Sequence, residues 1–199
     1  MRPNKIKQMW RAGQYVTMGW LSISHGFTAE VMARQGFDTL CIDMQHGTTE
    51  MNDVWPMLQA ISQTDTVPVV RVPWNDPATI MKALDLGAYG IIVPLVNTAA
   101  DAAKAVAACR YPPVGMRSSG PVRAMHYGGA DYVAQNPAWR MLLTFDAPFE
   151  AGGSFVGGRF VVEFEPFLAA RLDEARIAAK QDLPTIEHDA QFRHRPGAI

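Results

Sequence analysis

The fold is decided by residues 67–94, which read VPVVRVPWNDPATIMKALDLGAYGIIVP. The run Val67–Val72 is apolar almost throughout, as is typical of a strand buried on both faces of a parallel sheet. Asn75–Pro77 then combines a helix cap with a proline in the first turn, and it predicts a helix that ends near Gly87. A second apolar run follows at Tyr89–Val93. The segment therefore predicts strand, helix and strand, the repeating unit of α/β proteins.

The same unit recurs along the first part of the chain. The further predicted elements are a strand at 15–23, a helix at 27–35 closed by Gly36, a strand at 39–42, and helices at 51–63 and 98–109. Equivalent points at Asp43, Arg71 and Pro94 follow one another at intervals close to the roughly 31 residues per unit of a (β/α)-barrel. A barrel is favoured over a doubly wound sheet, because no Gly-x-Gly-x-x-Gly follows the first strand.

The repeat fades after residue 135. A proline- and glycine-rich loop at 111–121 precedes this point, and strands at 141–145 and 159–165 and a helix at 167–180 are the elements expected beyond it. A full barrel needs about 250 residues, so 199 residues leave space for roughly six units. We therefore divide the chain into a βα-barrel portion, 1–135, and a divergent segment, 136–199. This segment belongs to the same domain or is partly disordered, and the barrel is incomplete or altered in its second half.

The composition is that of a globular protein. Hydrophobic residues make up 48% of the chain, and 18 basic residues stand against 19 acidic ones, which excludes a polybasic nucleic-acid binder. Cys41 and Cys109 cannot form a disulfide framework, and no apolar run approaches a membrane span. The predictions are a cytoplasmic location and no nucleic-acid or membrane partner. An incomplete barrel would also expose the apolar faces of Ile91–Val93, so we expect a homo-oligomer.

Polar residues follow the predicted strands, where the active sites of barrels lie. Asp43 and His46 are close enough in the chain for the carboxylate to hold one imidazole nitrogen and leave the other as a general base. Arg71 offers a permanent cation to an oxyanion or a substrate carboxylate. Structural interpretations stand beside these: Asp43 and His46 as a plain structural hydrogen bond, Arg71 as one half of a structural ion pair, and Trp20 as a core residue.

Several segments in the same order carry a family resemblance. They are GFDTLCIDMQH at 36–46, VVRVPWND at 69–76, GAYGIIVP at 87–94 and RYPPVGMR at 110–117. Over about residues 15–135 the chain resembles the HpcH/HpaI aldolase family. These are class II, metal-dependent pyruvate aldolases, such as those that act on 2-dehydro-3-deoxyglucarate or 4-hydroxy-2-oxoheptanedioate. The resemblance implies a TIM-type barrel of the phosphoenolpyruvate/pyruvate type.

The resemblance also implies roles for individual residues. His46 would be the acid–base residue, Asp43 its orienting partner, and Arg71 the group that holds the keto oxygen and stabilises the enolate. Trp20 and Gln45 would bind the substrate: Trp20 would form a wall of the pocket, and Gln45 stands where the family usually has glutamate.

The implied cofactor is a divalent cation, Mg²⁺, Mn²⁺ or Co²⁺. The family holds it with a glutamate at the end of the fifth strand and an aspartate in a Gly-Pro-x-Asp-like turn. No such turn follows Gln135, and Glu165 is the candidate ligand that remains.

Three functions stay open on the sequence. The first is reversible aldol cleavage of a 4-hydroxy-2-oxo acid to pyruvate and an aldehyde, both small molecules. The second is an acyl-CoA lyase of the citrate-lyase type, for which Arg117 and Arg123 are the candidate diphosphate ligands. The third is a non-catalytic remnant of an aldolase that lacks its metal ligands.

Overall fold

A computed structural model describes residues 2–135, 142–145 and 160–162 of the protein. The chain divides into two units, Met1–Glu165 and Pro166–Ile199, and all of the described residues lie in the first. The helix expected at 167–180 therefore lies outside the described residues. Within them, no helix combines the length and the apolar character needed to cross a membrane.

A single sheet of six strands organises the described residues, and its strands follow one another in chain order. They are β1 (Met18–Leu21), β2 (Thr39–Asp43), β3 (Val67–Arg71), β4 (Gly90–Val93), β5 (Leu142–Phe145) and β6 (Phe160–Val162). The first five strands are parallel, as predicted, whereas β6 runs antiparallel to β5. Parallel neighbours in sequence order are the arrangement of a (β/α)-barrel wall.

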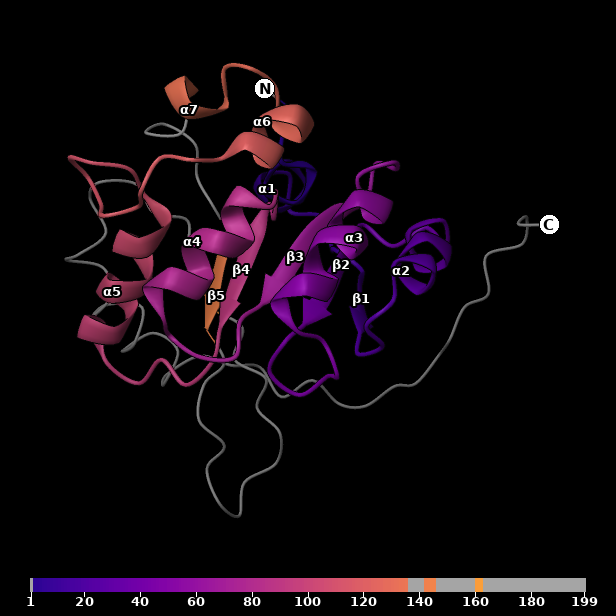
Figure 1. Ribbon diagram of the computed structural model, residues 1–199, viewed down its shortest axis with the longest axis horizontal. Helices are drawn as coiled ribbons and strands as arrows, with labels where there is room; N and C mark the ends of the chain where they lie inside the picture. The colour runs from indigo at the N-terminus through magenta and orange to yellow at the C-terminus, as the bar shows by residue number, and fades with distance from the viewer. Residues whose placement is uncertain (1, 136–141, 146–159, 163–199) are drawn as a thin grey trace, which may run out of the picture. The chain divides into compact units, whose positions relative to one another are not determined.

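Seven helices accompany the sheet in the part of the chain that the structure describes. They are α1 (Lys5–Arg11), α2 (Gly26–Ala33), α3 (Met51–Ile61), α4 (Pro77–Asp85), α5 (Ala99–Cys109), α6 (Val122–Gly128) and α7 (Tyr132–Gln135). The helices α2 to α5 are the predicted ones, and α3, α4 and α5 lie over the same face of the sheet (Figure 1). Asp76 caps α4 by accepting a hydrogen bond from the backbone N–H of Thr79. His25 caps α2 by accepting a hydrogen bond at Nδ1 from the backbone N–H of Phe27.

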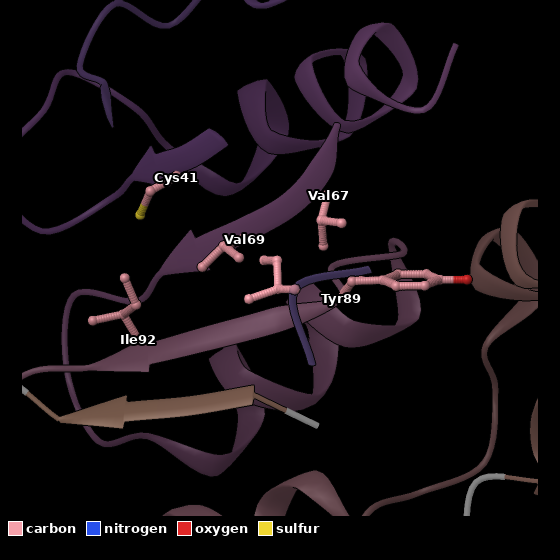
Figure 2. Close-up of a cluster of buried hydrophobic side chains, with 6 residues drawn as sticks. Cys41, Val67, Val69, Tyr89 and Ile92 are labelled. Carbon is pink, nitrogen blue, oxygen red and sulfur yellow. The ribbon is translucent and has the colours of Figure 1, made fainter. Parts of the chain in front are cut away.

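The two faces of the sheet bury different sets of side chains. Side chains alternate between the faces along a strand, so Cys41 points away from the face that carries its neighbours Leu40 and Ile42. Cys41, Val69 and Ile92 form a buried cluster on one face, together with Val67, Tyr89 and Ile6 of α1 (Figure 2).

The apolar side chains of β4 are covered within the chain itself. Ile91, Ile92 and Val93 are at most 3% exposed. The expectation that their faces are open to solvent is therefore wrong: successive side chains point to opposite faces of the sheet, and all three are buried. The apolar surface of β4 accordingly gives no argument for a homo-oligomer.

The proline- and glycine-rich loop is anchored by a buried arginine. Arg117 is 0% exposed, donates to Asp85 Oδ1 at 2.7 Å and lies with its guanidinium carbon 4.7 Å from the centre of the Tyr111 ring. Arg123 donates to the carbonyl of Leu86. Asp85 and Leu86 precede β4, so both arginines stabilise the end of the sheet opposite the strand carboxyl ends. The prediction that they line a groove for a CoA diphosphate is wrong for Arg117, which is fully enclosed.

The burial of Arg117 predicts an asymmetry between two variants. Asp85→Ala leaves a fully buried guanidinium without its carboxylate, which is expected to lower the free energy of unfolding by about 3–5 kcal/mol. Arg117→Met leaves Asp85 without the guanidinium, but the Asp85 side chain is 24% exposed and can be hydrated. The free energy of unfolding is therefore expected to fall by less in Arg117→Met than in Asp85→Ala. Urea denaturation of the two variants measures both losses. Equal losses, or a larger loss for Arg117→Met, would contradict this account.

Candidate active site

An ion pair joins the carboxyl ends of β2 and β3. Asp43 and Arg71 are the last residues of their strands and lie opposite each other in the register. The guanidinium donates from Nε to Asp43 Oδ1 at 2.9 Å and from Nη2 to Oδ2 at 2.6 Å. A two-bond pair of this kind fixes the distance and the in-plane direction of the two groups, and it is among the stronger hydrogen-bonded arrangements in proteins. The strand register therefore sets the geometry of the site.

Asp43 also organises the turn that carries His46. Its Oδ1 accepts hydrogen bonds from the backbone N–H of Gln45 at 3.0 Å and of His46 at 3.2 Å. The predicted bond between the Asp43 carboxylate and the His46 imidazole is wrong, because the carboxylate is occupied by Arg71 and by these two backbone groups. The influence of Asp43 on His46 acts through the backbone of the turn, and the His46 side chain is exposed.

The charge state of Asp43 follows from these contacts. Burial by itself raises the pKa of the carboxyl, because the charged form loses hydration. The hydrogen bonds from Arg71 and from the backbone N–H groups of His46 and Gln45 outweigh burial, and the pKa of Asp43 lies below its ordinary value of 3.8. Asp43 is therefore an anion at neutral pH. It can hold Arg71, but it is a poor acid–base group, which leaves that role to His46.

Trp20 lies against the guanidinium of Arg71. The Arg71 Cζ atom is 4.5 Å from the centre of the indole ring, within the range of a cation–π contact. Trp20 pairs with Cys41 in the sheet, so its indole reaches Arg71 across the strand that carries Asp43. The structure thus brings Trp20, Asp43 and Arg71 together from three consecutive strands. The sequence analysis missed the contact between Trp20 and Arg71.

The loops after β1 and β2 are bonded to each other beside this cluster. Thr48 donates to the carbonyl of Ser22 from its backbone N–H at 3.2 Å, and its hydroxyl lies 3.3 Å from the same oxygen. A side chain at Gly47 would collide with the carbonyl of Asp43, so the close approach requires glycine. The Oε1 atom of Gln45 is buried in this turn and accepts no hydrogen bond from the described residues. An acceptor in this state has capacity for a donor brought by a ligand.

The described residues do not form a metal site. Among residues 2–135, no three His, Cys, Asp or Glu side chains lie close enough together to hold an ion. Asp43 is engaged by Arg71, and Asp76 and Asp101 cap helices. The candidate ligand Glu165 lies outside the described residues. The described residues alone therefore do not hold the cation that the resemblance implies.

Comparison with known proteins identifies the family. The family model for HpcH/HpaI aldolase/citrate lyase matches residues 16–148. The chain belongs to this family. The predicted resemblance is thus confirmed, and the match extends beyond residue 135 to include β5. A crystal structure of an HpcH/HpaI aldolase/citrate lyase family protein from Burkholderia cenocepacia has a TM-score of 0.66 at 36% identity, covering 72% of this chain and 59% of that one. The TIM-type barrel fold is likewise confirmed.

Curated relatives in the family are aldolases. The hydroxypyruvate/pyruvate aldolase of Rhizorhabdus wittichii is 45% identical over 132 residues, which are 66% of this chain and 53% of that protein. The 4-hydroxy-2-oxo-heptane-1,7-dioate aldolase of Salmonella dublin is 42% identical over 117 residues, which are 59% of this chain and 44% of that protein. The chain spans about half the length of the curated relatives it matches.

The ion pair predicts a pH-dependent loss of stability in Asp43→Asn. At neutral pH the variant is expected to lose about 1.5–3 kcal/mol of the free energy of unfolding, the range for hydrogen bonds to charged groups. The pKa of Asp43 is lower in the folded chain than its ordinary value of 3.8. The stabilisation is therefore complete above about pH 4 and is lost as the pH falls through the folded-state pKa.

Urea denaturation of wild type and Asp43→Asn between about pH 7 and pH 3 measures this effect. The difference between the two proteins is expected to be constant near neutral pH and to shrink below about pH 4. Asp65→Asn serves as the control, since the Asp65 side chain is fully exposed. If the free energies of unfolding of wild type and Asp43→Asn differed as much near pH 3 as near pH 7, the lowered pKa assigned to Asp43 would be contradicted.

Proposed function

We propose that this site belongs to a carbon–carbon lyase that cleaves a 4-hydroxy-2-oxo acid reversibly to pyruvate and an aldehyde. The observation that carries the proposal is the Asp43–Arg71 pair, which presents a fixed cation beside the His46 turn at the carboxyl ends of the strands. Membership of the family supports it, as do the aldolase names of the curated relatives.

The reaction requires a base and a stabilised oxyanion. In the cleavage direction a base removes the proton of the 4-hydroxyl, the C3–C4 bond breaks, and its electron pair passes into the enolate of pyruvate while the aldehyde leaves. The exposed imidazole of His46 suits the proton transfer, since histidine is the side chain that most often acts as a general acid–base group. It takes the hydroxyl proton and delivers a proton to C3 of the enolate.

Arg71 stabilises the negative charge that develops on the former keto oxygen. A preorganised cation lowers the energy of such a charge without having to rearrange during the reaction. The Asp43 carboxylate keeps the guanidinium in place, and the ion pair with Arg71 balances the charge of the carboxylate. In this proposal Gln45, which lies in the same turn as His46, contributes to substrate binding.

Proton exchange on pyruvate tests the proposal without the aldehyde. An enolate that forms reversibly on the protein replaces the methyl protons of pyruvate by deuterium in D₂O, which NMR follows directly. We expect exchange by the full chain in the presence of Mg²⁺, and His46→Ala is expected to slow it by about 10²–10⁴-fold, the usual contribution of a general acid–base group. The reaction without Mg²⁺ measures the dependence on the cation.

His126→Ala is the matched control, because His126 is an exposed histidine on α6, away from the strand carboxyl ends. It is expected to exchange pyruvate protons at the wild-type rate. Absence of exchange from folded wild type with Mg²⁺ would overturn the proposal and favour a non-catalytic member of the family.

A further inference from the structure

Among the contacts of the described residues, two different groups restrain the guanidinium of Arg71 in two directions. Asp43 holds one edge through Nε and Nη2, and the indole of Trp20 lies against the group with Cζ 4.5 Å from the ring centre. The Arg71 side chain is 14% exposed, so little of it is in contact with solvent. Both restraints come from the strands that precede β3, and both act on the same planar cation.

The two restraints are not redundant. Two parallel hydrogen bonds along one edge set the distance of a guanidinium from its carboxylate and its direction in the plane. The guanidinium plane can still rotate about the line that runs along its hydrogen-bonded edge, because neither hydrogen bond contacts the face of the group. An aromatic ring at cation–π distance opposes this rotation and removes water from one side of the charge.

We propose that Trp20 is a positioning residue that acts through Arg71: its indole holds the plane of the guanidinium so that the cation faces the enolate oxygen. The inference rests on the proposed function and deepens it. It assigns Trp20 a role different from that of a pocket wall, which would act by touching the substrate. A wall residue contributes to binding of the ground state, whereas a positioning residue for Arg71 contributes to the step in which the negative charge forms.

Kinetics separate the two roles. For pyruvate proton exchange by the full chain, Trp20→Leu is expected to lower kcat about tenfold, the effect of losing one partly buried cation–π contact, with KM changed less than about twofold. Trp20→Phe keeps an aromatic face and is expected to retain most of kcat. In an Arg71→Lys background, Trp20→Leu is expected to add no further loss, because an ammonium has no plane to orient.

A second measurement does not depend on activity. The Arg71 Nε–H proton has its own NMR signal, which is assigned by its loss in Arg71→Lys, and its exchange with solvent reports how firmly the guanidinium is held. Exchange is expected to be about tenfold faster in Trp20→Leu than in wild type and nearly unchanged in Trp20→Phe. Trp55→Leu is the control, since Trp55 is an exposed tryptophan on α3.

Each combination of results decides one claim. Faster Nε–H exchange together with lower kcat in Trp20→Leu supports the inference. Unchanged Nε–H exchange in Trp20→Leu overturns the inference. If kcat is lower while this exchange is unchanged, the result assigns Trp20 a direct contact with substrate. Faster Nε–H exchange with unchanged kcat also overturns it. If wild type exchanges no pyruvate protons, the proposed function fails, and the Nε–H signal still decides whether Trp20 holds Arg71.

Discussion

The ion pair between Asp43 and Arg71 is the contact on which the site depends. Removing a carboxylate or a guanidinium from water costs several kcal/mol unless a partner of opposite charge is in place. Each residue ends a strand, and the register between β2 and β3 sets them opposite each other. A shift of one residue along either strand would turn one charge to the other face of the sheet. The hydrophobic packing that fixes the register therefore also fixes the chemistry.

Much of the fold could be predicted because the signals are local. The helix α4 begins after the Asp76 cap, and α5 begins after Thr98, which forms a reciprocal capping box with Asp101. The helices that the sequence analysis missed are short or weakly signalled. The helix α6 follows Pro121, which gives it no side-chain cap, and α1 follows Asn4, whose side chain donates to the carbonyl of Tyr89 and makes no cap bond.

That Asp43, Arg71 and the His46 turn lie together was predictable, whereas their contacts were less so. The spacing in the chain predicts Asp43 near His46, and the order of the strands predicts Asp43 near Arg71. The carboxylate has few acceptor positions, however, and several donors compete for them. A charged guanidinium and two backbone N–H groups occupy it in the structure. The stacking of Trp20 on Arg71 depends on the direction of two long side chains across an intervening strand, and no local pattern encodes that.

The site residues come from one continuous part of the chain. Trp20, Asp43, Gln45, His46 and Arg71 all precede β4, and their mutual contacts involve no later strand. During translation, the ribosome has therefore polymerised every one of these residues before it begins β4. The pairing of Asp43 with Arg71 spans 28 residues of chain, with one helix and one strand between them, so the entropy that it costs is smaller than that of joining the two ends of a whole barrel.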